Sequence, residues 1–243
     1  MSEFITWANL PDKKVKTVLI GCHERIIKSL NSLKIETVVL DDNPEIDFSV
    51  RNHADMAALH LGCDRIILDK RQISAAESLE RMGFCVGFTE KNIGGEYPDD
   101  VRLNCAVVGN KMICGKRGVE PELLTMPFER LTVNQGYCKC SVCILTENAI
   151  ITDDESIYKR TRDIFDALLI SKGDILLEGK DYGFIGGASA RLSGDSVTFF
   201  GSLKYHRDGD KIKDFAEKHG LSCVELFDGR LTDIGSVIPI LQE

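Results

Sequence analysis

Three short segments carry side chains that could act together in a chemical reaction. NHADMAAL holds His53 and Asp55, NQGYCKCSV holds Cys140, and TDIGSVIPI holds Asp233. A cysteine thiolate is a strong nucleophile, and histidine is the side chain whose charge changes near neutral pH. Carboxylates pair with planar N–H groups through two parallel hydrogen bonds. These residue types are those that nucleophilic catalysis with acid and base assistance requires.

Each of these residues also has an ordinary structural interpretation. His53 could hydrogen-bond at the start of a strand, Asp55 could cap a turn, and Cys140 could be a small buried hydrophobe. Asp233 could be a loop residue. If residues 53–55 are extended, alternation along the strand places His53 and Asp55 on one face, where they can act as a pair.

A cofactor or metal is not indicated. Cys138, Cys140 and Cys143 form C-x-C-x-x-C, but on a strand Cys143 would lie on the face opposite the other two. No second pair of Cys or His stands at the spacing of a tetrahedral zinc site, so we expect no metal. The glycines at 186–187 and the GKRG segment at 115–118 lack the strand-to-helix context of a phosphate loop, which argues against a nucleotide.

The elements that must position these residues form a repeat of two apolar strands joined by a tight turn. Copies start at residues 54, 101, 138, 186 and 233, at steps of 47, 37, 48 and 47 residues. Such spacing is typical of radial or solenoidal repeats. Turns are predicted around Gly62 and Asp64, at Gly109 and Asn110, at Glu147 and Asn148, and at Gly194 and Asp195.

The fifth copy supplies one strand only, so its partner must come from elsewhere in the chain. KTVLIG at residues 16–21 fits, and this pairing would close the five units into a ring without exposed strand edges. Closure predicts that trimming residues 16–21 destabilises the whole protein.

Between the hairpins the pattern changes to a helix and then a third strand. We expect helices at 23–34, 71–83, 154–173 and 208–220, followed by strands within 35–42, 84–90, 174–179 and 221–229. The sequence therefore predicts an α/β fold of five ββαβ units, a five-bladed α/β propeller that forms one domain over residues 1–243. An ordinary mixed α/β sandwich is the alternative.

This pattern resembles the penteins, the guanidine-modifying enzyme superfamily of arginine and agmatine deiminases, dimethylarginine hydrolases and amidinotransferases. More narrowly, the chain resembles an uncharacterised bacterial family of that fold, and the resemblance spans about the whole chain. It implies a central channel lined by residues near the first strand of each unit, with a Cys, a His-x-Asp and further carboxylates.

For this chain the resemblance implies that Cys140 is the nucleophile and His53 the general acid and base. Asp55 and Asp233 would hold the guanidinium of a small substrate. The expected activity is that of an amidino hydrolase or deiminase, and transfer to a second amine is another outcome. A non-catalytic pentein that binds a ligand or a protein is the alternative function.

The order of the motifs departs from that of the family. There the cysteine lies near the C-terminus, where this chain has Ser236, so the match at Cys140 requires the ring to be cut elsewhere. A competing register compares LEGKDYGFIGG with a glycine-rich acidic segment of the family. It would make Cys105 the nucleophile and place Asp233 at the histidine position. The intact His53-x-Asp55 lies two units before Cys140, as in the family, and therefore favours Cys140 over Cys105 as the nucleophile.

Charge, hydropathy and cysteine content indicate which partners and which cellular compartment to expect. A net charge of −8 argues against nucleic acid, whose binders carry a basic face. The sequence has no apolar run near the roughly 20 residues of a membrane helix and no signal-peptide core in MSEFITWANLPDKK. The nine cysteines are expected to be reduced thiols, so we expect a cytoplasmic protein. The oligomeric state is not indicated.

Overall fold

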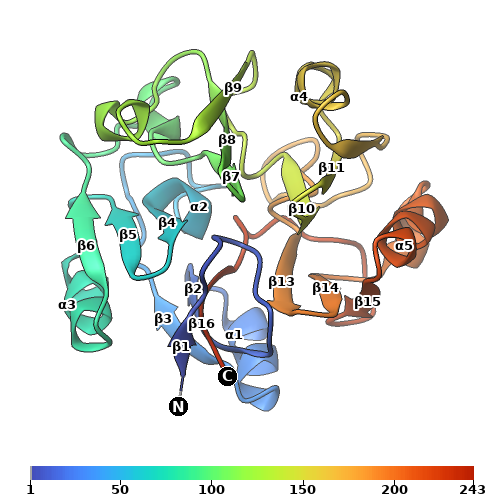
Figure 1. The fold of residues 1–243 in the computed structure, drawn as a ribbon, viewed down its shortest axis with the longest axis horizontal. Helices are drawn as coiled ribbons and strands as arrows, with labels where there is room; N and C mark the ends of the chain where they lie inside the picture. The colour runs from blue at the N-terminus through green and yellow to red at the C-terminus, as the bar shows by residue number, and fades with distance from the viewer. Residues whose placement is uncertain (1) are drawn as a thin grey trace.

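The structure, a computed structural model, describes residues 2–243 and contains five small β-sheets. In Figure 1 these sheets follow one another around the middle of the view in chain order. The strands are β1 (Glu3–Phe4), β2 (Val15–Ile20), β3 (Glu36–Val39), β4 (Ala58–Gly62), β5 (Arg65–Leu68), β6 (Cys85–Phe88), β7 (Ala106–Val108), β8 (Lys111–Gly115), β9 (Glu129–Val133), β10 (Val142–Thr146), β11 (Ala149–Thr152), β12 (Asp166–Leu169), β13 (Ser189–Ser193), β14 (Ser196–Phe199), β15 (Ser222–Glu225) and β16 (Ile238–Gln242).

Four sheets share one plan, which confirms the predicted hairpins and, at β6 and β15, the predicted third strands. In β4-β5-β6, β7-β8-β9, β10-β11-β12 and β13-β14-β15, the first two strands are antiparallel and the last two parallel. The predicted turns separate the strands of each hairpin. Gly109, between β7 and β8, has a φ of 59°, a conformation that glycine adopts without strain.

The fifth sheet combines the two ends of the chain, in the order β1-β16-β2-β3. β16 pairs antiparallel with β2, with Ile238 opposite Leu19 and Pro239 opposite Val18. The predicted pairing of the segment near residue 16 with the last strand is therefore confirmed. Both strands are buried, so this sheet joins the N-terminal and C-terminal parts in the interior.

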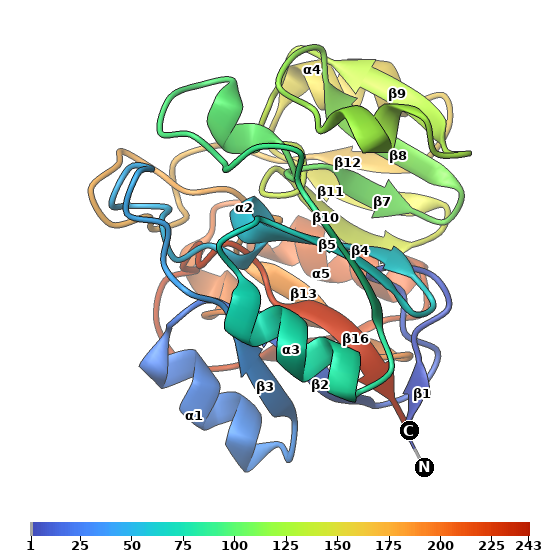
Figure 2. The same ribbon diagram turned by 90° about the vertical axis from the view of Figure 1, so that its left-hand side faces the viewer.

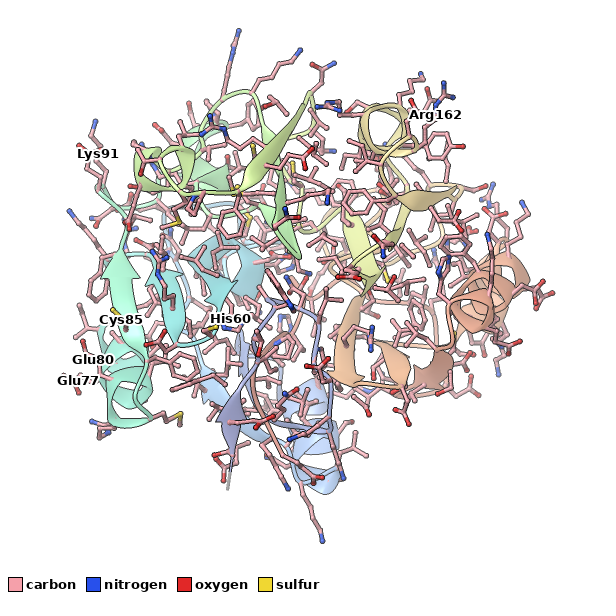
Figure 3. All side chains as sticks on the ribbon, viewed as in Figure 1. His60, Glu77, Glu80, Cys85, Lys91 and Arg162 are labelled. Carbon is pink, nitrogen blue, oxygen red and sulfur yellow. The ribbon has the colours of Figure 1, made fainter. Side chains whose placement is uncertain are left out.

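The helices are α1 (Glu24–Ser32), α2 (Ala54–Ala57), α3 (Ile73–Arg81), α4 (Glu155–Thr161) and α5 (Gly209–Lys218), with 3-10 turns η1 (Asp99–Val101), η2 (Pro121–Leu124) and η3 (Leu203–Tyr205). The helices α1, α3, α4 and α5 connect the second and third strands of their units, whereas the buried α2 precedes β4 and only the 3-10 turn η2 lies between β8 and β9. Each longer helix buries one apolar stripe, as Ile26 and Leu30 show in α1. In Figure 3, Glu77 and Glu80 of α3 lie at the periphery, whereas the buried His60 of β4 lies further in. No helix of residues 2–243 is long and apolar enough to cross a membrane.

The core consists of five apolar clusters, and each joins two units that are neighbours in Figure 1. One cluster packs Leu19 of β2 against Leu68 of β5, and another packs Ile20 of β2 against Leu192 of β13. Burying one such side chain stabilises the fold by roughly 1.5–3 kcal/mol. The apolar contacts of the core therefore lie mainly between neighbouring units.

Two predictions about the elements were wrong. The helix predicted at 154–173 ends at Thr161, and the third strand of that unit is β12 rather than 174–179. The segment DALL continues the sheet because it pairs in register with AIIT, with Leu168 opposite Ile151. The first strands also begin several residues later than the repeat starts at 54, 101, 138, 186 and 233. The residues before them instead run through the middle of the molecule.

Candidate active site

The five segments that precede the first strands β4, β7, β10, β13 and β16 meet through hydrogen bonds. Each segment is bonded to the next, and the last is bonded to the first. The bonds run from Asp55 N to Gly235 O (3.0 Å), Asn104 Nδ2 to Asp55 O (3.2 Å), Cys140 N to Asn104 Oδ1 (3.2 Å), Gly187 N to Cys140 O (2.9 Å) and Ser236 N to Gly187 O (3.1 Å). We call these residues the hydrogen-bond circle. It fixes the backbone from which the candidate side chains project.

Cys140 lies among the other predicted site residues. One donor atom each from His53, Asp55 and Cys140 lies within 4.8 Å of the others. The Cys140 thiol donates to Asp55 Oδ2 at 3.2 Å, and Asn104 Nδ2 donates to Cys140 Sγ at 3.1 Å. Burial raises the pKa of Cys140 well above its usual range, and Asp55 and Asp233 raise it further. Without a ligand, Cys140 is therefore a neutral thiol.

His53 precedes α2 as its N-cap and is 2% exposed. Its Nδ1 lies 3.9 Å from Asp233 Oδ1 and has no hydrogen-bond partner among residues 2–243. Burial lowers the pKa of His53, and Asp55 opposes this effect in part. The ring is therefore a neutral base whose buried Nδ1 has no hydrogen-bond partner among residues 2–243.

Asp55 lies in α2, so the expected strand at residues 53–55 was wrong, although Asp55 and His53 still lie within 4.8 Å of each other. The short helix also places the carboxylate beside Cys140. Asp55 Oδ2 also accepts from Ser236 Oγ at 3.0 Å, and Lys139 Nζ donates to the same hydroxyl at 2.8 Å. Burial raises the pKa of Asp55. Asp55 is thus held on the inner side of Cys140 by a buried polar network.

Asp233 is fixed by backbone donors. Its Oδ2 accepts from Phe184 N at 2.8 Å and its Oδ1 from Gly235 N at 3.0 Å. A Cβ atom at Gly187 would collide with this carboxylate, so a glycine is required there for the close approach. Burial raises the pKa of Asp233 to about 6.

A cavity of about 440 Å³ opens beside this group. His53, Cys140 and Asp233 are among its lining residues, and Asp55 is not. The rest of its wall comes largely from loops that project to the left in Figure 2, within residues 47–50, 95–100 and 177–184. A second cavity, of about 430 Å³, also has His53 and Asp233 among its lining residues.

Cys105, the competing nucleophile, lies elsewhere. It packs in an apolar cluster with Met112 and Cys114, and burial raises its pKa well above the usual range. In its unit the place in the hydrogen-bond circle belongs to Asn104. Cys138 donates to Gln135 O at 3.1 Å and is not part of the group around His53.

The donor atoms of His53, Asp55 and Cys140 are close enough to hold a small metal ion. Within this group the Cys140 thiol donates to Asp55 Oδ2, whereas His53 Nδ1 and Asp55 Oδ1 have no hydrogen-bond partner among residues 2–243. Of the residues that contact this group, Asn104 and Lys139 were missed from the sequence. Asn104 carries a detectable signal, because it precedes its first strand as Cys140 does.

Comparison with solved structures defines the class of fold. The inosamine-phosphate amidinotransferase from Streptomyces griseus is 11% identical with a TM-score of 0.61, over 99% of this chain and 97% of that one. Agmatine deiminase from C. jejuni, solved with substrate bound, is 10% identical with a TM-score of 0.57, over 99% and 96%. DDAH from Pseudomonas aeruginosa, in complex with citrulline, is 13% identical with a TM-score of 0.55, over 92% and 96%. The chain has the pentein fold of guanidine-modifying enzymes.

The sequence family is narrower than that class. Residues 19–238 match the Family of unknown function (DUF6873), and the chain belongs to this family. No curated protein is significantly similar to it in sequence. The family is thus an uncharacterised one with the pentein fold, which confirms the resemblance stated from the sequence.

Proposed function

We propose that this protein is a cysteine-dependent enzyme that modifies a small guanidine compound. The observation that carries the proposal is the group of His53, Asp55 and Cys140 at 4.8 Å or less, with His53 and Cys140 at the wall of a cavity. The structural neighbours include a deiminase and an amidinotransferase that share the fold. We also propose one domain over residues 1–243 and a cytoplasmic location.

The same proposal includes a closed pseudo-fivefold ring. The pairing of β2 with β16 and the hydrogen-bond circle support it, because both link the last unit to the first. The five apolar clusters, each between neighbouring units, support it further. Closure explains why residues from the whole length of the chain gather at one site.

In the first half of the reaction, binding of the guanidinium cation lowers the pKa of Cys140, because a nearby positive charge favours the thiolate. Neutral His53 accepts the thiol proton. The sulfur attacks the central guanidine carbon, and the C–N bond to the leaving nitrogen breaks. His53 returns the proton to that nitrogen, which departs as a neutral amine or ammonia.

In the second half, water attacks the carbon of the amidino-thioether while His53 accepts a proton from it. The C–S bond breaks, and Cys140 leaves as a thiolate that regains a proton from His53. His53 also lines the second cavity, from which we propose that this water enters. Attack by a second amine instead of water would transfer the amidino group.

We propose that the carboxylates of Asp55 and Asp233 both bind the guanidinium, although only Asp233 lines the cavity. Asp233 lines the cavity and lies near His53 Nδ1, so it can contact the cation and orient the imidazole. Asp55 lies beside Cys140, on the inner side, with Oδ1 free of partners among residues 2–243. Asp55 would reach a guanidinium only where the cation displaces the Cys140 thiol proton.

The second candidate function is a pentein that binds guanidines or another partner without chemistry. The burial of Cys140 and the raised pKa of its thiol favour it. Incubation with a panel of guanidines, followed by mass spectrometry of the products, separates the two. Turnover that disappears in Cys140→Ser supports the enzyme. Guanidine binding without turnover, equal in the native protein and in Cys140→Ser, supports the binder.

A further inference from the structure

The cavity beside Cys140 has more carboxylates than cations. Asp100 and Asp181 line it in addition to Asp233. The only lysine or arginine among its lining residues is Lys180, whose Nζ lies 2.6 Å from Asp47 Oδ2. That lysine is therefore already paired. The wall offers no free cation to a carboxylate or phosphate.

Asp100 is the most informative of these carboxylates, since it is only 5% exposed. Its Oδ2 accepts from Tyr137 OH at 2.5 Å, but its buried Oδ1 has no partner among residues 2–243. The neighbouring Arg102 does not compensate, because it is paired with Asp99 and Glu120. An unpaired buried carboxylate oxygen is costly, so a ligand N–H at this position would be stabilising.

The rest of the wall is aromatic. Tyr137 and Phe184 stack with ring centroids 6.4 Å apart, and Tyr97 and Tyr182 extend the row on either side. Aromatic faces attract cations and accommodate alkyl chains. An acidic cavity with an aromatic wall therefore fits a positively charged group on an alkyl chain.

We propose that the substrate carries a second positive charge besides its guanidinium, and that Asp100, hydrogen-bonded to Tyr137, holds this second charge. The substrate class is a guanidino-amine or a bis-guanidine without a carboxylate or phosphate. This inference rests on the proposed function, because it assigns the guanidinium to the side of the cavity with Cys140 and His53. Asp100 then determines specificity and takes no part in bond breaking.

Isothermal titration calorimetry with three probes of similar length tests this. Agmatine carries a second cation, butylguanidine a neutral tail and 4-guanidinobutyrate an anionic tail. Titrations use the full chain with Cys140→Ser, so that no turnover accompanies binding. Agmatine is expected to bind about 10-fold more tightly than butylguanidine, the effect of one charge-assisted hydrogen bond, and 4-guanidinobutyrate most weakly.

Asp100→Asn should weaken the binding of agmatine about 10-fold and leave the binding of butylguanidine unchanged. Asp99→Asn is the matched control, since it removes a neighbouring exposed carboxylate, and should change neither. Tyr137→Phe provides a second test if Asp100→Asn does not fold. It should weaken the binding of agmatine but not the binding of butylguanidine.

An unchanged ratio of agmatine to butylguanidine in a folded Asp100 or Tyr137 variant overturns the inference and leaves the proposed function intact. Binding of 4-guanidinobutyrate as tightly as agmatine also overturns the inference and leaves the proposed function intact. Failure of all three guanidines to bind overturns both.

Discussion

Cys105 and Cys140 occupy similar places in the sequence and very different places in the molecule. Cys105 lies one residue and Cys140 two residues before the first strand of a unit, both are at most 2% exposed, and burial raises the pKa of both thiols. Cys105 contacts apolar side chains, whereas Cys140 contacts Asp55 and Asn104 and lines a cavity.

The difference is one of position within equivalent segments. In the second unit the residue in the hydrogen-bond circle is Asn104, and the next residue, Cys105, lies in the core. In the third unit Cys140 itself occupies the circle. Burial therefore does not distinguish a reactive cysteine from a structural one, but the partners around the sulfur do.

The largest expected effect separates the two cysteines directly. Cys140→Ala should reduce turnover of any guanidine substrate by at least about 10³-fold, because the proposed nucleophile is lost. Cys105→Ala should leave the turnover rate nearly unchanged and lower the free energy of unfolding by about 1–2 kcal/mol through a small cavity. Product analysis and urea unfolding measure the two quantities. Equal loss of turnover in both variants would remove the distinction.

Asn104→Ala tests the contacts that place Cys140. The amide side chain accepts from the backbone N–H groups of Lys139 and Cys140, and both would lose their acceptor in the interior. We expect the free energy of unfolding to fall by about 3 kcal/mol. Asn92→Ala, at an exposed loop position, is the control and should change it by less than about 0.5 kcal/mol. A loss below 1 kcal/mol for Asn104→Ala would show that the circle contributes little.

Asp55→Asn tests the electrostatic part of the comparison. Because the pKa of Cys140 is raised, its thiolate is scarce at neutral pH, and its alkylation should accelerate as pH rises toward that pKa. Asp55→Asn removes one negative charge beside the sulfur, so the pKa should fall and alkylation by neutral chloroacetamide at pH 8 should become several-fold faster. Peptide mapping after timed alkylation measures the rate. A slower or unchanged rate would mean that Asp55 does not control the thiol.

The smallest effect is expected at the cavity mouth. Asp47 and Lys180 pair across two loops, but both side chains are 44% exposed. Asp47→Asn and Lys180→Met should each change the free energy of unfolding by less than about 1 kcal/mol, as for other solvent-exposed pairs. Urea unfolding checks this. A larger loss would place part of the stability at the mouth rather than in the buried circle.

Local pattern predicts the units well. The hairpin turns, the outer helices and the pairing of residues near 16 and 235 follow from apolar periodicity and turn residues, and the structure confirms them. The exception is DALL, which was assigned to a helix because an apolar run of four fits either element.

The inner segments were harder to predict because their conformation depends on distant partners. Asp55 lies in a short helix and donates its own backbone N–H to Gly235 O, and Asn104 bonds to residues 35 and 36 positions away. No pattern within one unit reports such contacts. The types of the candidate residues were readable from the sequence, and the network that holds them was not.

The most direct test of the central claim is the labelling of the native protein with 2-chloroacetamidine and with chloroacetamide, its neutral counterpart. The account predicts that Cys140 forms the adduct, that the cationic reagent reacts faster at pH 7, and that Cys105 stays unmodified. An intact Cys140 while the exposed Cys22, Cys63 and Cys85 react, or an adduct at Cys105 instead, would contradict it.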